Sequence, residues 1–155
     1  MPNLESYQFS INFWYGVRLI KRLYKEALDE AGKALGLTGA EAAVINFLRE
    51  NPEFDTARDI AALRDVSRAY VSGAVEHLVK RRYLTIRTDE EDRRLQHLVI
   101  TDKCKPIAEA LHQAHWDFYA KVTEGLTDED LLNLWVIIEK CAKNLLEGDI
   151  TPPNV

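Results

Sequence analysis

The sequence DVSRAYVSGAVEHLVKRR, residues 65–82, carries the pattern from which the architecture of the chain follows. Four of its apolar residues recur at helical spacing and form one stripe: Val71, Val75, Leu78 and Val79. Ser67 stands just before this run, where its hydroxyl can accept a hydrogen bond from a free amide of the first turn. The stretch therefore predicts a helix that begins after Ser67 and buries one face.

The opposite face of this helix suits DNA reading. At about 100° per residue, the residues opposite the stripe are Ala69, Gly73, Glu76 and Lys80, and those on its shoulders are Tyr70, Ser72 and His77. The outward face is thus small in its N-terminal half and charged in its C-terminal half. A helix in a major groove brings its N-terminal residues to the base edges, while other contacts hold phosphates.

Two short segments of alternating polarity follow the helix. Residues 84–87 and 96–101 have the period of a half-buried ribbon, whose inward residues are Leu84, Ile86, Leu98 and Ile100. The polar sequence TDEEDRR, residues 88–94, connects them. A helix pair followed by a two-stranded ribbon with arginines at its tip predicts a mainly α winged helix-turn-helix with a small β wing.

The remaining helices of the lobe have clear boundary signals. Thr38 and Glu41 have capping-box spacing and open a helix that Asn51-Pro52 ends, with Ala43, Val44, Phe47 and Leu48 on its buried face. Thr56 and Asp59 are spaced in the same way and start a short helix with Ile60, Ala61 and Leu63 inward. Residues 64–66 are then short enough to be the turn of a helix-turn-helix.

Amphipathic helices flank the lobe on both sides. One long helix is predicted over about residues 7–34, and it packs on its own core or pairs with another subunit. Pro106 tolerates a first turn better than an interior, so the next helix is expected to begin near Lys105 and to continue to Gly125. Thr127 caps a last helix, in which Cys141 is expected to be buried and which Gly148 closes before a tail at 148–155.

Composition and charge limit the classes of protein. The 155 residues, 46% hydrophobic and 29% charged, predict one globular unit. The net charge is −5, yet residues 56–101 hold nine positive and seven negative side chains, so the proposed DNA-reading part is the less acidic one. Two cysteines, no signal sequence and no apolar run of the roughly 20 residues needed to span a bilayer predict a cytoplasmic protein without membrane attachment.

These elements together resemble the MarR family of transcriptional regulators, from about Leu35 to the C-terminal helix. The motif that carries the likeness runs through Leu78, the strand at 83–84, Arg87, the wing Asp92-Arg93-Arg94 and the closing Ile100-Thr101. In that family a wing arginine enters the minor groove, whose narrow form concentrates negative potential. The resemblance implies that Asp92 organises the wing and that Arg93 or Arg94 is the probe.

The resemblance also implies a set of DNA-contacting residues and three departures from the family pattern. The expected contacts are Ser67, Arg68, Ala69, Tyr70, Ser72, Gly73, His77, Lys80, Arg87, Arg93 and Arg94. Arg82 replaces the usual glycine after the helix, so it either adopts a left-handed conformation or the helix ends differently. Gly73 replaces a charged residue, and we interpret it as allowing close approach to the bases. Cys104 replaces a glycine after the closing threonine.

Family members are commonly homodimeric repressors that a small, often aromatic, ligand releases from a pseudo-palindromic operator. The resemblance therefore implies one unit, residues 1–155, with a DNA-binding lobe at 37–101 and a dimerisation region at 7–34 and 102–147. A ligand pocket could be lined by Trp14, Tyr15, Phe47, His112, His115, Trp116 and Tyr119. The same side chains could equally fill the core.

Other functions have weaker support in the sequence. His112 and His115 with Cys104 or Glu109 could bind zinc, and Cys104 between two lysines could sense oxidants, so metal and thiol sensing stay open as alternatives. A helical interaction module without a DNA role would explain the apolar terminal helices but not the arginine-tipped wing. We find no phosphate loop, nucleophile elbow or acid pair, so no enzymatic activity, cofactor or resident metal is predicted.

Overall fold

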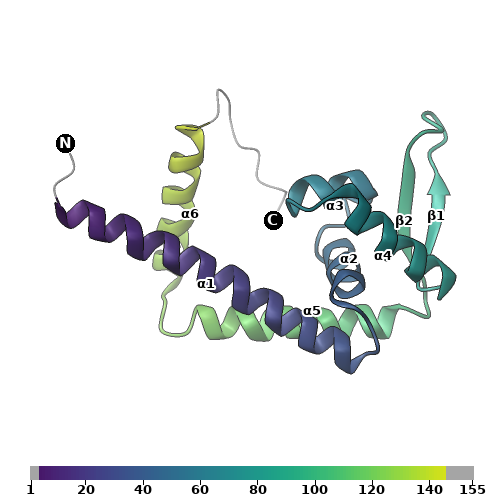
Figure 1. Ribbon diagram of the computed structural model, residues 1–155, viewed down its shortest axis with the longest axis horizontal. Helices are drawn as coiled ribbons and strands as arrows, with labels where there is room; N and C mark the ends of the chain where they lie inside the picture. Colours follow the sequence, from purple (N-terminus) through teal and green to yellow (C-terminus); the bar gives the residue numbers. More distant parts are fainter. Residues whose placement is uncertain (1–3, 146–155) are drawn as a thin grey trace. The chain divides into compact units, whose positions relative to one another are not determined.

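The computed structural model describes residues 4–145, with side chains from Asn12 onward. The described residues form six helices and one antiparallel hairpin (Figure 1). In order these are α1 (Leu4–Ala34), α2 (Gly39–Glu50), α3 (Ala57–Leu63), α4 (Arg68–Lys80), β1 (Leu84–Thr88), β2 (Gln96–Ile100), α5 (Lys105–Val122) and α6 (Asp128–Lys143). This confirms the predicted class, a mainly α fold with a two-stranded wing. The chain divides into two compact units between Tyr119 and Ala120.

The core of the first unit is built around α2, which is buried on nearly every side. The predicted buried face of α2 was incomplete: Ala43 is half-buried, whereas Glu41, Ile45 and Asn46 are buried as well. The reason is that α1, α4 and the hairpin all pack on this one helix. A Cβ added to Gly32 of α1 would lie 2.6 Å from the Cβ of Ala42, so this glycine permits the close packing of α1 on α2.

The predicted starts of α2, α3, α4 and α6 are confirmed, whereas α1 begins at Leu4 and not near residue 7. Thr38 with Glu41, Thr56 with Asp59 and Thr127 with Asp130 form capping boxes, and the Ser67 hydroxyl accepts a hydrogen bond from the Tyr70 amide. The turn of the helix-turn-helix passes through Asp65, whose φ of 52° is left-handed. Leu63 was wrongly expected to point inward: it is 52% exposed, because α3 has only seven residues and buries Ile60 and Ala61 alone.

The hairpin pairs Leu84 with Ile100 and Ile86 with Leu98, so the four residues that were predicted to alternate inward share one face. Leu84 and Leu98 are buried, but Ile86 is 44% exposed, which corrects the expectation that it faces the core. The strands extend beyond the body of the lobe, so only their base is covered (Figure 1).

None of the helices among residues 4–145 is both long and apolar enough to cross a membrane.

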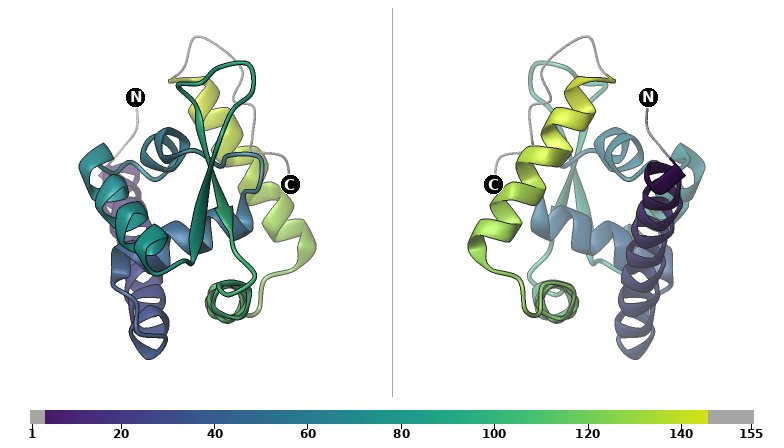
Figure 2. Two further views of the ribbon diagram at one scale, coloured as in Figure 1. Left: turned by 90° about the vertical axis from the view of Figure 1, so that its right-hand side faces the viewer. Right: turned by 90° about the vertical axis from the view of Figure 1, so that its left-hand side faces the viewer.

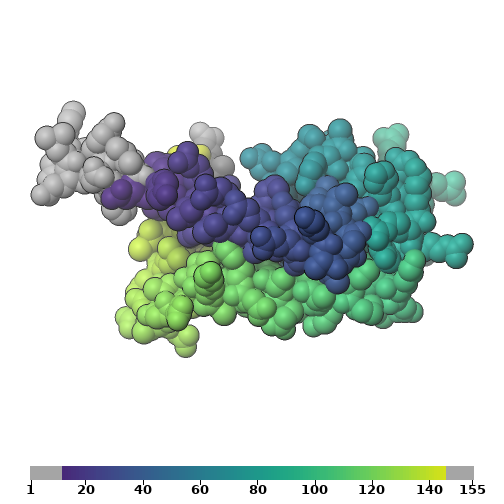
Figure 3. Space-filling view, turned by 60° about the horizontal axis from the view of Figure 1, so that its bottom comes forward, coloured from purple at the N-terminus to yellow at the C-terminus, as the bar shows by residue number. Residues whose placement is uncertain are grey.

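The C-terminal helices begin as predicted, α5 at Lys105 and α6 at Asp128. Helix α5 ends at Val122, three residues before Gly125, which lies in a turn with a φ of 81°. Cys141 is exposed in the structure, so the expectation that it is buried was wrong. The predicted closing Gly148 and the tail at 148–155 lie outside the described residues. Figure 3 shows α1 (purple to blue) running beside α5 (green).

Candidate nucleic-acid interface

Helix α4 and the hairpin lie on one side of the first unit. The left view of Figure 2 has both near the viewer, and the right view has both behind. Every residue predicted to contact DNA is exposed: Ser67, Arg68, Ala69, Tyr70, Ser72, Gly73, His77, Lys80, Arg87, Arg93 and Arg94. The structure thus brings the predicted helix residues and the predicted wing residues to one side, where a single ligand could reach both.

The N-terminal half of α4 leaves its outward face open. The Ser67 hydroxyl oxygen is 3.1 Å from the Tyr70 amide that it caps, and its own hydrogen remains able to donate. A Cβ added to Gly73 would meet no atom within 4 Å. Packing within the described structure therefore gives no reason for this glycine, which leaves close approach of a ligand as an explanation.

The C-terminal half of α4 carries side chains that already have partners. Lys80 donates to Glu76 at 2.6 Å, an exposed pair one helical turn apart. The Nδ1 of His77 lies 3.9 Å from a carboxylate oxygen of Glu41, so the ring is turned toward α2. Binding of either residue to a phosphate would compete with these contacts.

Arg82 adopts the left-handed conformation, which decides between the two ways in which the sequence allowed the helix to end. Its φ is 59°, its amide bonds to the Val79 carbonyl and the next amide, of Tyr83, bonds to the Leu78 carbonyl. This is the hydrogen-bond pattern of a Schellman motif with arginine in the position that glycine favours. The Thr101 hydroxyl donates to the Arg82 carbonyl at 2.8 Å and fixes the turn against the end of the wing.

Two aspartates hold the tip of the wing. Asp92 Oδ1 accepts from the Arg94 amide at 2.9 Å, which fits the organising role expected for Asp92. Asp89 Oδ1 accepts from the amides of Glu91 and Asp92, both at 2.8 Å. These hydrogen bonds, the one from Asp92 foremost, lower the pKa of Asp89. The role of Asp89 was missed because the sequence TDEEDRR offers two aspartates and no signal of which backbone amides they face.

His97 is a second residue that the sequence did not single out. Its Nδ1 lies 2.6 Å from Oδ1 of Asp55 and its Nε2 lies 3.1 Å from Oδ2 of Asp89. The carboxylates of Asp55 and Asp89 raise the pKa of His97. Alternation along the strand could have placed this ring on the face opposite Leu98. Nothing in the sequence links it to Asp55, 42 residues away.

Several arginines of the interface have guanidinium groups available to a polyanion. Among residues 12–145, no ion pair or side-chain hydrogen bond engages the side chains of Arg68, Arg93 or Arg94. Arg81 differs, since it donates to the Gly36 carbonyl at 2.9 Å and pairs with Glu41. The start of α4 and the tip of the wing therefore each offer cationic groups to DNA.

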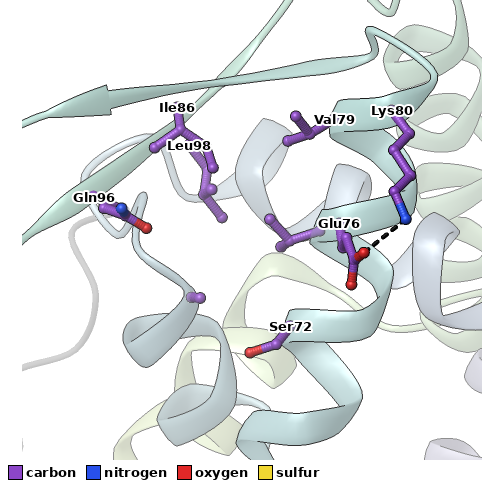
Figure 4. A pocket seen from close by; sticks show the side chains of 9 residues that line it. Ser72, Glu76, Val79, Lys80, Ile86, Gln96 and Leu98 are labelled. Carbon is purple, nitrogen blue, oxygen red and sulfur yellow. Dashed lines mark hydrogen bonds and ion pairs between the residues drawn. The ribbon is translucent and has the colours of Figure 1, made fainter.

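A groove of about 440 Å³ separates α4 from the hairpin (Figure 4). Its apolar wall consists of Ala57, Val75, Val79, Ile86 and Leu98, and its polar edge of Ser72, Glu76, Lys80 and Gln96. In Figure 4 the labelled side chains of α4 and of the strands face one another across the space. The groove lies between the two parts that would enter adjacent DNA grooves.

The residues expected to line a ligand pocket fall into three places. Trp14 and Tyr15 are exposed on the N-terminal half of α1, and Phe47 is buried in the core. His112, His115, Trp116 and Tyr119 are joined by ring contacts along α5, with centroids 4.9–6.0 Å apart. Only this last group is brought together by the structure.

A polar chain that the sequence did not reveal connects the α5 aromatic group to α1 and α2. Asn46 donates to the Tyr24 hydroxyl at 3.1 Å, and that hydroxyl lies 2.9 Å from Nδ1 of His115. Burial lowers the pKa of His115, which favours the neutral ring, and Nδ1 of a neutral ring can accept a hydrogen bond from the hydroxyl. Oε1 of Glu50 lies 2.5 Å from Nδ1 of His112. Oδ1 of Asn46 is buried without a hydrogen-bond partner in the described structure.

Cys104 does not have the setting of a reactive thiol. It is fully buried, and burial raises the pKa of its thiol to about 11. A redox sensor needs an accessible thiolate, so the burial of Cys104 argues against the thiol-sensing alternative. Among the described residues, no three His, Cys, Asp or Glu side chains are grouped to hold a metal ion.

Residues 35–95 match the MarR family. The HTH-type transcriptional regulator YpoP of Bacillus subtilis (strain 168) is 23% identical over 128 residues, 81% of this chain and 89% of its own. A MarR-family regulator from Listeria monocytogenes complexed with a 26mer DNA has a TM-score of 0.73 at 16% identity, over 85% of this chain and 87% of that chain. CouR from Rhodococcus jostii RHA1 bound to p-coumaroyl-CoA has a TM-score of 0.70 at 18% identity, over 86% and 93%. These structural likenesses show the fold.

Proposed function

We propose that the chain is a transcriptional regulator of the MarR family, which residues 35–95 match, and that it binds specific sequences of double-stranded DNA as a homodimer. The observation that carries the proposal is that α4 and the wing lie on one side of the first unit (Figure 2). Each presents arginines, Arg68 on the helix and Arg93 and Arg94 on the wing, to solvent. The helix would enter a major groove and the wing the neighbouring minor groove.

The homodimer is supported by the apolar surface that the chain leaves exposed on α1. Phe13, Trp14, Tyr15, Ile20 and Leu23 are each more than 40% exposed on this one helix. Large apolar side chains exposed close together in sequence on one helix suit an interface with a second subunit. A two-fold symmetric dimer would read a pseudo-palindromic site with half-sites about one turn (~10 bp) apart.

We further propose that a small aromatic ligand releases the protein from DNA, so that it acts as a repressor in the cytoplasm. The His112, His115, Trp116 and Tyr119 group supplies aromatic faces for such a ligand. Asn46, in the same hydrogen-bond chain, supplies an acceptor, because its buried Oδ1 has no hydrogen-bond partner among the described residues. CouR, which has this fold, binds p-coumaroyl-CoA. A ligand would act only through a difference in affinity between the DNA-binding state and the released state.

The proposal is tested by selecting bound duplexes from a random DNA library with the purified protein at near-physiological salt. The expected result is a two-fold-symmetric motif with half-sites about one helical turn (~10 bp) apart. The double variant Arg93→Ala/Arg94→Ala is the negative control, because it removes two wing arginines whose guanidinium groups have no partner among the described residues. Recovery of no motif by the wild type, with weak retention that salt abolishes, would contradict the proposal and favour an interaction module.

A further inference from the structure

The ring of His97 joins the wing loop to the segment between α2 and α3. Its two nitrogens lie 2.6 Å from Asp55 and 3.1 Å from Asp89. Backbone contacts support the same junction, because the Leu98 amide donates to the Asp55 carbonyl at 2.8 Å and His97 forms a β-bridge with Thr56. Asp55 belongs to the body of the lobe and Asp89 to the wing loop, so the imidazole connects the lobe to the start of that loop.

Both partners of the ring are carboxylates, and this sets its protonation state. An ionised carboxylate accepts hydrogen bonds but donates none. A neutral imidazole carries one N–H and could donate to only one of the two, whereas the imidazolium carries two. The side chains of His97, Asp55 and Asp89 are 19%, 28% and 31% exposed, so the three charges are partly shielded from water. The geometry thus matches the charged ring.

Taken together, the neighbouring charges also favour the protonated form of the His97 ring. Asp55 faces His97 from the segment before α3, and Asp89 faces it from the wing loop. Arg87, its cross-strand partner on β1, opposes protonation. Two carboxylates against one guanidinium leave the ring with a raised pKa, chiefly through the hydrogen bond to Asp55 and then through that to Asp89.

The contacts continue from His97 to the arginines at the wing tip. The other oxygen of Asp89 accepts from the amides of Glu91 and Asp92. The Asp92 carboxylate in turn accepts from the Arg94 amide. The position of the tip is therefore tied, through two aspartates, to a ring that is anchored on the lobe.

We propose that His97, as an imidazolium, is the positioning residue that holds the arginine wing against the lobe, so that DNA affinity decreases as the pH rises through its titration. The inference rests on the DNA binding proposed above. A raised pKa means that the docked wing is favoured at low pH. This stabilisation is complete below the ordinary histidine value of about 6.5 and is lost as the pH rises through the raised value.

A first experiment needs no DNA. The ring signals of the four histidines are followed by NMR against pH, with His97→Gln to assign the signal of His97. We expect His97 to titrate above about 6.5 and the order parameters of amides 89–95 to fall at higher pH. In Asp89→Asn the amide oxygen can still accept from Glu91 and Asp92, while its NH₂ faces the ring. The His97 titration should then move to lower pH without loss of fold.

The second experiment measures the dissociation constant of a DNA duplex between pH 6 and 8.5 at fixed salt. The probe is the duplex recovered by selection or, without a motif, a mixed-sequence duplex. Wild-type affinity should weaken several-fold with rising pH, while His97→Gln, which cannot titrate there, should bind at the weaker level throughout. Because the two proteins differ only at residue 97, the other histidines do not affect the comparison.

The outcomes separate this inference from the proposed function. A His97 that titrates at or below about 6.5, with unchanged order of amides 89–95, overturns the inference even if DNA binds. An equal pH dependence of affinity in wild type and His97→Gln overturns it as well. Absence of binding to every duplex at every pH refutes the proposed function and the effect on affinity, while the NMR titration still decides whether His97 anchors the wing.

Discussion

The guanidinium of Arg81, at the end of α4, lies 3.4 Å from the carboxylate of Glu41, in the first turn of α2. Glu41 is only 3% exposed, and the same carboxylate oxygen accepts from the Thr38 amide at 2.8 Å. Arg81 also donates to the Gly36 carbonyl and lies over the Tyr83 ring, 4.6 Å from its centroid. A buried charge in α2 is thus compensated from the end of α4.

We expect Arg81→Ala to lower the free energy of unfolding by about 2 kcal/mol, less than for a fully buried pair because Arg81 is partly exposed. The loss arises because the Glu41 charge stays buried without its partner. Urea unfolding measures it. In a Glu41→Gln background the amide oxygen can still accept from Thr38 while the charge is gone, so Arg81→Ala should cost less there. An equal loss in both backgrounds would show that the ion pair is not the cause.

Arg82→Gly is expected to stabilise the protein by up to about 1 kcal/mol, because glycine adopts the left-handed conformation without the strain of a Cβ. Part of the gain is offset by the larger entropy of glycine in the unfolded chain. Lys80→Gly, two residues earlier and within α4, is the matched control and should destabilise by about 1 kcal/mol. Thermal unfolding of the two variants should therefore shift in opposite directions; a loss of stability in Arg82→Gly would contradict the strain argument.

The elements of the fold could be predicted from local signals, because those signals act within a few residues. Capping boxes at Thr38 and Thr56, the hydroxyl of Ser67 and the placement of Pro106 all bear on backbone groups one turn away, and the helices start where these residues indicate. Helix α4 and the wing were found in the same way. Their placement on one side of the unit came from the resemblance to a known family.

The residues whose surroundings were wrongly predicted or missed are those whose environment depends on distant parts of the chain. Ile86 alternates correctly along its strand, but whether a strand is covered depends on how far the hairpin extends from the lobe. His97 and Asp55 are 42 residues apart, and only the docking of the hairpin beside α3 brings them together. Cys104 has lysines on both sides in the sequence, yet its own side chain is buried in the core.

The two cysteines are expected to differ sharply in reactivity. Cys104 is buried, with a thiol pKa raised to about 11 by desolvation, whereas Cys141 is exposed. The thiolate is the reactive form, so a disulfide reagent at pH 7.5 should modify Cys141 at once and Cys104 only after unfolding. Ellman titration of wild type and Cys141→Ser provides the test. Rapid labelling of native Cys141→Ser would mean that Cys104 is accessible and would reopen the redox alternative.

Arg94→Ala should weaken binding to the selected duplex and lower the slope of log affinity against log salt by about one. The reason is that its guanidinium has no partner in the described structure, so the free protein loses nothing that would offset the lost contact with DNA. Glu90→Ala at the same tip is the control, since removal of a negative charge should not weaken binding. Equal salt slopes in wild type and Arg94→Ala would place Arg94 outside the interface.

Gly73→Ala separates helix stability from DNA binding on the outward face of α4. A Cβ at this position would meet no atom within 4 Å, so alanine adds no clash in the free protein. It also removes the unfavourable helix propensity of an interior glycine, and the free energy of unfolding should rise by about 1 kcal/mol.

If the bare backbone of Gly73 lies against the bases, the added methyl group should weaken binding to the selected duplex. Gly16→Ala in α1, where a Cβ likewise meets nothing within 4 Å, is the control for helix stability and should raise the free energy of unfolding by a similar amount. A Gly73→Ala protein that gains stability and keeps full affinity would mean that the glycine does not serve close approach.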